Sequence, residues 1–255
     1  MCLLAVAWKV HPEYPLVVCA NRDEFYARPT QAANFWTDSP DIFAGRDLQA
    51  GGSWMGINQK GRFAAVTNIR NPASNRTDVK SRGGLVSEFL NQQITAIDYS
   101  NKLQSQGEYY NGYNLLSFDG DALVYQSNGV EQPENLQPGI YGMSNATLDI
   151  PWPKTCSAVE KITEWIKCPS GVNELAGLLN DRNIAADGKL PQTGVSLTLE
   201  RMLSAEFITS AEYGTRCSTG FLLHKSGQAE YCEISHGESA GVRHQVVEHY
   251  LPDQA

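Results

Sequence analysis

Short apolar, β-rich stretches recur in the first half of the chain, and turn-forming residues separate these stretches. The stretches form three pairs around short turns: residues 2–10 with 16–24, 53–58 with 62–70, and 113–118 with 122–128. Paired β-rich runs joined by Pro- or Gly-containing turns are typical of β-hairpins. The pattern predicts three hairpins of a meandering antiparallel sheet, whose first strand begins at the start of the chain.

Helical spacing replaces these β-rich stretches in the middle of the chain. Val159, Ile162 and Trp165 lie on one face of a helix that follows Pro153, a residue suited to a first helical turn. We expect two further helices at 87–104 and 171–183, and strands again at 215–225, 229–236 and 242–250. Hairpins, a helical middle and more strands predict an α+β protein whose helices pack against sheets.

The composition is that of an ordinary globular chain. Its 255 residues are 42% hydrophobic and 19% charged, which is enough to bury a sizeable core. No internal repeat or linker is visible, so we expect a single domain over residues 1–255. A formal net charge of -8, with no block of Lys and Arg, disfavours nucleic acid and anionic membranes as partners. The composition favours an organic small molecule.

The apolar N-terminal segment lacks the features of a targeting or membrane-spanning segment. No basic region precedes it, and Lys9, His11, Pro12 and Glu13 interrupt it well short of the roughly 18–20 residues that a span requires. We therefore expect no transmembrane segment and a cytoplasmic location.

Cys2 is the candidate nucleophile. The six cysteines contain no CxxC pair, and most are expected to be small buried hydrophobic residues. Once Met1 is removed, Cys2 carries both a thiol and a free α-amine, whose reference pKa is about 7.7–8.0 and which is able to accept the thiol proton. The alternative is that Cys2 is an ordinary strand residue.

Four polar residues in a row close the second predicted strand: Asn21, Arg22, Asp23 and Glu24. Successive strand residues point to opposite faces, so only some of the four can face one site. An arginine or carboxylate beside the amine and thiol of Cys2 would hold these groups and shift their pKa values. The alternative is a solvated turn of mixed charge.

This tetrad resembles the signature of the NRDE-motif family, which includes proteins of the transport and Golgi organisation 2 type. The preceding Met-Cys strand matches as well, and so do the stretches GGSWMGINQKGRFAAVTNIR, RGGLV, YGMSNATLDIPWPK and GTRCSTGFLL, so that the resemblance runs through nearly the whole chain. The order of these elements is more distantly similar to N-terminal-nucleophile (Ntn) hydrolases of the choloylglycine hydrolase and penicillin V acylase type. That similarity implies an αββα four-layer sandwich in which a mature N-terminal cysteine cleaves amides.

The acylase resemblance also implies residue roles. Cys2 matches the nucleophile, and Asn68, which ends GINQKGRFAAVTN, matches an oxyanion-hole asparagine. Asn145 in GMSN matches a further asparagine, and Arg216 in GTRCS matches an arginine near the nucleophile.

The tetrad departs from the acylase pattern. The acylases carry an arginine and an aspartate three positions apart, whereas here Arg22 and Asp23 are adjacent and Asn21 and Glu24 are three apart. Either pair is a candidate for facing Cys2.

The expected function is hydrolysis of a non-peptide amide or a thioester of a small hydrophobic molecule. The Cys2 thiolate would attack the carbonyl while the Asn68 and Asn145 amides donate hydrogen bonds to the oxyanion, each typically worth about 3 kcal/mol. This chemistry requires no cofactor and no metal.

The alternative is a binding protein that uses the same cavity without turnover, because members of the family have been linked to haem trafficking and to lipid or acyl-CoA metabolism. Candidate haem ligands are Cys2 and the five histidines His11, His224, His236, His244 and His249. Candidate apolar walls are Trp36, Trp54 and Trp152.

Overall fold

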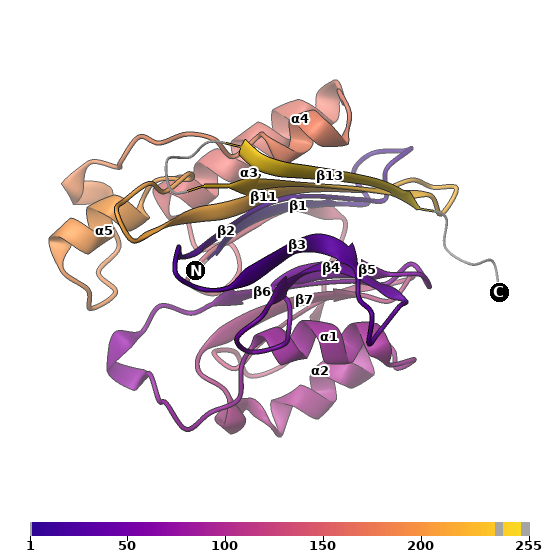
Figure 1. Ribbon diagram of the computed structural model, residues 1–255, viewed down its shortest axis with the longest axis horizontal. Coiled ribbons are helices and arrows are strands. Elements are labelled where there is room, and N and C mark those ends of the chain that lie inside the picture. Colours follow the sequence, from indigo (N-terminus) through magenta and orange to yellow (C-terminus); the bar gives the residue numbers. More distant parts are fainter. Residues whose placement is uncertain (1, 238–241, 251–255) are drawn as a thin grey trace.

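Two antiparallel sheets form the centre of the protein. The computed structural model describes residues 2–237 and 242–250, and Figure 1 shows the sheets stacked face to face. The first sheet has the strand order β10-β1-β2-β11-β12-β13. Its strands are β10 (Gly139–Met143), β1 (Cys2–Trp8), β2 (Leu16–Phe25), β11 (Tyr213–Leu223), β12 (Ala229–His236) and β13 (Val242–Tyr250).

The second sheet follows the chain order β3-β4-β5-β6-β7-β8-β9, as a meander does. Its strands are β3 (Thr30–Phe35), β4 (Ile42–Asp47), β5 (Met55–Asn58), β6 (Phe63–Asn68), β7 (Tyr113–Phe118), β8 (Leu123–Ser127) and β9 (Glu134–Asn135).

Helices cover the outer face of each sheet. Helices α1 (Gly83–Asn91) and α2 (Ala96–Gln104) pack on the second sheet, while α3 (Pro153–Lys167) and α4 (Val172–Ala176) pack on the first (Figure 1). The short helix α5 (Leu197–Leu203) and the 3-10 turns η1 (Pro72–Ser74), η2 (Gly107–Tyr109) and η3 (Asp187–Lys189) complete the described elements. The order helix, sheet, sheet, helix confirms the predicted α+β class and its αββα layering.

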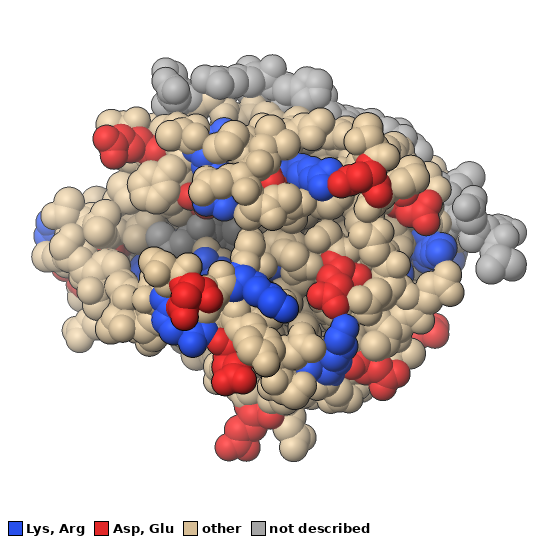
Figure 2. Space-filling model, turned by 60° about the horizontal axis from the view of Figure 1, so that its bottom comes forward, with Lys and Arg blue, Asp and Glu red and all other residues tan. Residues whose placement is uncertain are grey.

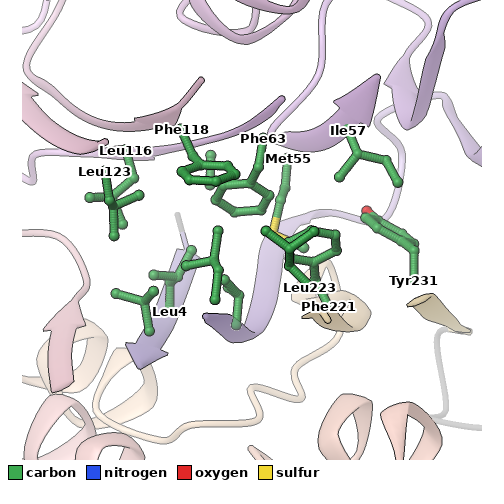
Figure 3. Packing of buried hydrophobic residues seen from close by; sticks show 14 of the residues in the cluster. Leu4, Met55, Ile57, Phe63, Leu116, Phe118, Leu123, Phe221, Leu223 and Tyr231 are labelled. Atoms are coloured by element: carbon green, nitrogen blue, oxygen red, sulfur yellow. The ribbon is translucent and has the colours of Figure 1, made fainter. Parts of the chain in front are cut away.

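The central core lies between the two sheets. Phe221 of β11 stacks on Phe63 of β6 with ring centroids 5.1 Å apart, so the two sheets meet through aromatic side chains. Figure 3 shows the side chains of both layers pointing toward one another, with Leu4, Leu223 and Tyr231 facing Met55 and Phe118. In β1 the even-numbered Leu4, Val6 and Trp8 belong to this core, whereas Leu3, Ala5 and Ala7 pack against the helices. Every second residue of a strand shares one face, as the pleat requires.

The three predicted hairpins are confirmed as β1/β2, β5/β6 and β7/β8. The helix after Pro153 is confirmed as α3, and the predicted C-terminal strands are confirmed as β11, β12 and β13. Strands β3 and β4 lie in a stretch for which the sequence pattern predicted no element.

Two predicted helices were wrong in extent. The expected helix at 87–104 is two helices, because Gln92 adopts extended backbone and Thr95 caps α2 by accepting a hydrogen bond from the Asp98 N–H at 3.2 Å. The expected helix at 171–183 covers only Val172–Ala176, and residues 177–183 form a loop.

Among the described residues, no helix combines the length and apolar character needed to cross a membrane.

Candidate functional site

The last residues of β2 divide between the two faces of the first sheet. Register pairs Arg22 with Cys2 on one side and with Cys217 on the other. Arg22 shares the face of Val18 and Cys217, which belong to the core between the sheets. Asn21 shares the face of Val17 and Cys19, which pack toward the helices. The pleat therefore separates the tetrad, as strand alternation predicts.

Asn21 is fully engaged on the helix side. Its Nδ2 donates to the main-chain carbonyls of Leu179 and Glu206 at 2.7 and 2.9 Å, and its Oδ1 accepts from the Ser218 hydroxyl at 2.7 Å. The side chain is 1% exposed. Asn21 thus ties the end of β2 to two loops that follow α4 and α5.

Asp23 is completely buried beside the start of α3. Its Oδ1 accepts from the Thr215 hydroxyl at 2.7 Å. Burial raises the pKa of the Asp23 carboxyl, while the positive charge of Lys154 and the Thr215 hydrogen bond act in the opposite direction. Lys154 of α3 is itself buried, so the Asp23 carboxyl of β2 lies near a buried ammonium group.

Arg22 lies on the face between the sheets. Its guanidinium stacks over the Trp54 ring, 4.2 Å from the centroid, and Nη1 donates to the Thr30 hydroxyl at 3.2 Å. Stacking of this kind holds a cation in a defined position without neutralising it. Gly45 makes room for the indole, because a Cβ at that position would overlap the Trp54 ring.

The backbone places Cys2 next to Arg22. Their Cα atoms are register partners at the beginning of β1, while the Cys2 side chain lies outside the described residues. By strand alternation, position 2 belongs to the same face of the sheet as Leu4, Val6 and Trp8. Arg22 of β2 belongs to this face as well.

A cavity of about 440 Å³ opens beside Arg22 at this end of the sheets. Its lining includes five cations, Arg22, Arg28, Arg76, Lys80 and Arg82, and three acids, Asp23, Glu24 and Asp47. We call it the cationic cavity. Figure 2 shows Lys and Arg atoms gathered around a hollow on this side of the molecule.

A second cavity of about 410 Å³ adjoins the first, because Glu24, Asn68 and Arg82 line both. Its other walls are mainly apolar and come from four chain segments. The apolar residues are Phe25, Ile69, Pro72, Val195, Leu199, Met202, Leu203 and Tyr213, and Arg70, Asn71 and Asn75 add polar side chains. We call it the apolar cavity.

Asn68 and Asn145 are brought together at the wall between β6 and β10. Asn145 Nδ2 donates to the Asn68 carbonyl at 2.9 Å, and the Arg70 N–H donates to the Asn145 carbonyl at 2.8 Å. Asn68 lines both cavities, whereas the buried Asn145 is not among the residues that line either one. The pairing of β10 with β1 ends at Met143, which lies opposite Leu4. Asn145 follows two residues later and so lies near the start of β1.

Arg216 occupies a β-bulge of β11 and supports the loop after β2. Its Nη1 donates to the carbonyls of Phe25, Tyr26 and Arg28 at 2.7, 3.2 and 3.1 Å. Arg216 is not among the described residues that line the two cavities. Its predicted place near the nucleophile stays a prediction.

Glu233 is a buried acid on the inner face that the sequence did not single out. Its Oε1 accepts from the Ala33 N–H at 2.8 Å and so links β12 of the first sheet to β3 of the second. Burial raises the pKa of the Glu233 carboxyl to about 7, against the opposing effects of the Ala33 hydrogen bond, Cys217 and the charge of Arg22.

The three histidines with described side chains are not among the residues that line the two cavities. Each contacts a neighbour elsewhere: His11 stacks on Tyr14, His224 contacts Glu230, and His236 contacts Ser218. Burial lowers the pKa of His236 to about 4, and the side chains of His244 and His249 lie outside the described residues. The haem prediction therefore stays a prediction, and its candidates Cys2, His244 and His249 have side chains outside the described residues.

Two further observations bear on cofactors. Of the predicted apolar walls, Trp54 lines the cationic cavity, while Trp36 donates to the Ala44 carbonyl at 3.0 Å and Trp152 lies beside Arg70. In the described part of the chain, no group of three or more His, Cys, Asp and Glu side chains is arranged to hold a metal ion.

Residues 69–82 hold a local excess of cations that the predictions from sequence did not use. This segment holds Arg70, Arg76, Lys80 and Arg82 but one acid, Asp78, which contrasts with the net charge of -8 for the whole chain. By contrast, no local pattern distinguishes Lys154 or Glu233, whose places follow from the packing of distant strands and helices.

Comparisons with known proteins agree with the resemblance noted in the sequence. The family model "Transport and Golgi organisation 2" matches residues 1–237. The chain is 35% identical to the Transport and Golgi organization protein 2 homolog of Bos taurus over 257 residues, covering 92% of this chain and 93% of that protein.

Two solved structures are similar at low identity. A Caenorhabditis elegans N-acylethanolamine-hydrolyzing acid amidase ortholog is 10% identical with a TM-score of 0.49, covering 87% of this chain and 92% of that one. A C2A mutant of the conjugated bile acid hydrolase from Clostridium perfringens is 8% identical with a TM-score of 0.44, covering 97% and 96%. By its sequence, the chain belongs to the Transport and Golgi organisation 2 (TANGO2) family.

Proposed function

We propose that the protein is a cysteine hydrolase of the N-terminal-nucleophile type, in which Cys2, exposed by removal of Met1, attacks a non-peptide amide or a thioester. The observation that carries the proposal is the pairing of Cys2 with Arg22, a residue that lines the cationic cavity. This pairing brings the first residue of β1 to the edge of a space that is large enough for a small organic molecule.

In the proposed reaction, the α-amine of Cys2 takes the thiol proton and the sulfur forms a bond to the substrate carbonyl carbon. The C–N or C–S bond to the leaving group then breaks, and the ammonium returns the proton to that group. Water attacks the resulting thioester, the C–S bond breaks, and the free acid and the Cys2 thiol are released.

Arg22 and Asn68 support this chemistry electrostatically. The Arg22 guanidinium favours the thiolate and disfavours the protonated α-amine, because a nearby positive charge lowers the pKa of both groups. Asn68 lies on the wall shared by the two cavities and supplies the amide for the developing oxyanion. Asn145 acts as a positioning residue through its hydrogen bond to the Asn68 carbonyl.

The alternative role, binding of haem or of a lipid or acyl-CoA without turnover, uses the same space. It differs from the hydrolase in one respect that is measurable: no acyl group becomes attached to residue 2.

The test is a panel of acyl amides and acyl thioesters, incubated with the wild-type protein and with Cys2→Ser, Cys2→Ala and Cys156→Ser variants. Cys156 is an exposed free cysteine and serves as the matched control. We expect turnover by the wild-type protein and Cys156→Ser, loss of turnover in Cys2→Ala, and an acyl adduct on residue 2 in mass spectra of the wild-type protein or Cys2→Ser. Equal turnover by Cys2→Ala and the wild-type protein would exclude the mechanism, and saturable binding with no turnover of any substrate would favour the alternative.

A further inference from the structure

A buried ion pair joins α5 to the chain that leaves β6. Arg70 follows Asn68 of β6 by two residues, and Glu200 belongs to α5. Arg70 Nη1 lies 2.9 Å from Glu200 Oε2, and both side chains are only 5% exposed. Figure 1 shows α5 at the same end of the molecule as the loop that follows β6. The pair therefore links two segments that are 130 residues apart in the chain.

Stability alone does not account for an ion pair in this place. Taking two charges out of water is costly, and their mutual attraction often only offsets that cost. Well-packed apolar side chains of similar size would hold α5 at least as well. Apolar side chains do not supply direction, however, whereas a guanidinium presents its N–H donors in a rigid planar fork. The pair therefore fixes where the remaining donors of Arg70 point.

A second donor of the guanidinium reaches Asn145. Arg70 Nη2 donates to Asn145 Oδ1 at 3.3 Å, and Asn145 Nδ2 donates to the Asn68 carbonyl at 2.9 Å. Because an arginine carries donors and no acceptor, only the oxygen end of the Asn145 amide bonds to it. Arg70 thus selects the orientation in which the nitrogen end of Asn145 faces Asn68.

Arg70 is also held by contacts outside the ion pair. Its main-chain N–H donates to the Asn145 carbonyl at 2.8 Å, so the two residues are bonded through both main chain and side chain. Its guanidinium lies 5.1 Å from the centroid of the Trp152 ring. A displacement of Arg70 would therefore move Asn145 as well.

Glu200 connects this corner to a cavity wall. Its Oε1 accepts from the Thr193 N–H at 2.8 Å and from the Thr193 hydroxyl at 2.6 Å, while Oε2 faces Arg70. Other residues of the same helix, Leu199, Met202 and Leu203, line the apolar cavity. Helix α5 is thus both a wall of the apolar cavity and the partner of Arg70.

We propose that Arg70 and Glu200 are positioning residues that couple α5 to Asn145 and Asn68. Asn68 is then held at the wall between the cavities only while α5 is packed in place. The inference rests on the proposed function for the role of Asn68 toward the oxyanion. It adds a link between the wall of the apolar cavity and the reacting end of the site.

Amide hydrogen exchange of the ligand-free protein, followed by mass spectrometry, measures the coupling without turnover. Glu200→Gln removes the charge that holds Arg70 and keeps the size of the side chain. We expect about tenfold faster exchange in peptides that contain the Arg70 N–H, because its hydrogen bond to the Asn145 carbonyl opens more often. Thr193→Val, a milder change that removes one donor to Glu200, should accelerate exchange about threefold.

An exposed ion pair of the same helix provides the matched control. Arg201 Nη2 lies 2.6 Å from Asp187 Oδ2, with both side chains exposed. Asp187→Asn breaks this pair without touching Arg70, so it should leave both the exchange of the Arg70 N–H and kcat unchanged.

Turnover of the best acyl substrate separates positioning from folding. Arg70→Lys keeps the charge but lacks the planar fork, so we expect kcat to fall about tenfold with KM within about threefold of the wild-type value. Glu200→Gln should lower kcat in the wild-type background but have little further effect in Asn145→Ala, because both changes act through the same amide.

Unchanged exchange of the Arg70 N–H in Glu200→Gln would overturn the inference, and so would losses of kcat that multiply in the double variant Glu200→Gln/Asn145→Ala. Failure of the proposed function gives a different result. If exchange rises in Glu200→Gln and not in Asp187→Asn, but the wild-type protein hydrolyses none of the acyl substrates, the hydrolase proposal fails and the coupling of α5 to Asn145 stands.

Discussion

The two faces at the end of β2 differ in how their polar residues are used. On the helix side, Asn21 and Asp23 are buried and hydrogen bonded to loops and to β11. On the side between the sheets, Arg22 is held by an aromatic ring and a hydroxyl and faces a cavity. These polar residues therefore serve two purposes: Asn21 and Asp23 fasten β2 to neighbouring segments, and Arg22 contributes charge to the candidate site, whose lining also includes Asp23.

Glu24 marks the point where this division ends. It lies one residue before β2 stops, is only half buried, and lines both cavities. Of the two pairs that the sequence left open for facing Cys2, neither lies wholly on the inner face, because each combines one residue from each side of the strand.

The largest expected effect tests the helix side. Asn21→Ala removes a buried side chain that bonds two carbonyls and a hydroxyl, so we expect it to lower the free energy of unfolding by about 4 kcal/mol. Urea denaturation measures this change. Asn91→Ala, at an exposed position, is the control and should change stability by less than about 0.5 kcal/mol. A loss in Asn21→Ala no larger than in the control would remove the structural role assigned to this face.

The next effect tests the inner face, through pH. The pKa of Glu233 is about 7 in the folded protein against an ordinary value of 4.5, so the folded state holds this proton more tightly than the unfolded chain does. Its contribution to stability is therefore lost as pH rises from about 4.5 to about 7 and stays lost above that range. Glu233→Gln should stabilise the protein by about 3 kcal/mol at pH 8 and by little at pH 4.5.

Unfolding curves of the wild-type protein and Glu233→Gln at both pH values measure this difference. A glutamine retains an oxygen that accepts the Ala33 hydrogen bond, so the variant isolates the charge. Identical stability differences at pH 4.5 and pH 8 would show that burial does not perturb this carboxyl as described.

A smaller effect separates the two faces directly. Arg22→Gln should reduce turnover of the best substrate by about thirtyfold, near 2 kcal/mol, because it removes the positive charge beside Cys2, and it should change stability by less than about 1 kcal/mol. Asn21→Gln, on the opposite face, should show the reverse pattern, with reduced stability and nearly normal turnover per folded molecule. Turnover in Arg22→Gln equal to that of the wild-type protein would remove Arg22 from the site.

Much of the fold could be predicted because its signals are local. Apolar, β-rich runs on either side of a Pro-containing turn predicted β1 and β2, and Pro153 with the apolar spacing that follows it predicted α3. The break at Gln92–Thr95 was missed because the apolar spacing continues across it, and the cap depends on Thr95 and on Asp119, which accepts from the Ala96 N–H at 2.7 Å.

The candidate site could be predicted only in part. Alternation indicated that the tetrad must divide, but not which half faces the sheets' interior, since that depends on where α3 and α4 pack. The resemblance to the acylases singled out Asn68 and Asn145, which are hydrogen bonded to each other in the structure. The cavities could not be predicted, because residues 69–82 and α5 form part of their walls. Glu233 and Lys154 could not be found, because Glu233 accepts its hydrogen bond from Ala33 and Lys154 acts on Asp23, and each of these partners lies more than a hundred residues away in sequence.

The most direct test of the central claim is the intact mass of the purified protein. The proposed mechanism requires the α-amine of Cys2 as base, and so predicts a mass that corresponds to residues 2–255 without Met1. Retention of Met1 in all molecules of a preparation that turns over substrate would contradict the mechanism, because the Cys2 nitrogen would then be a peptide amide, which does not accept the thiol proton.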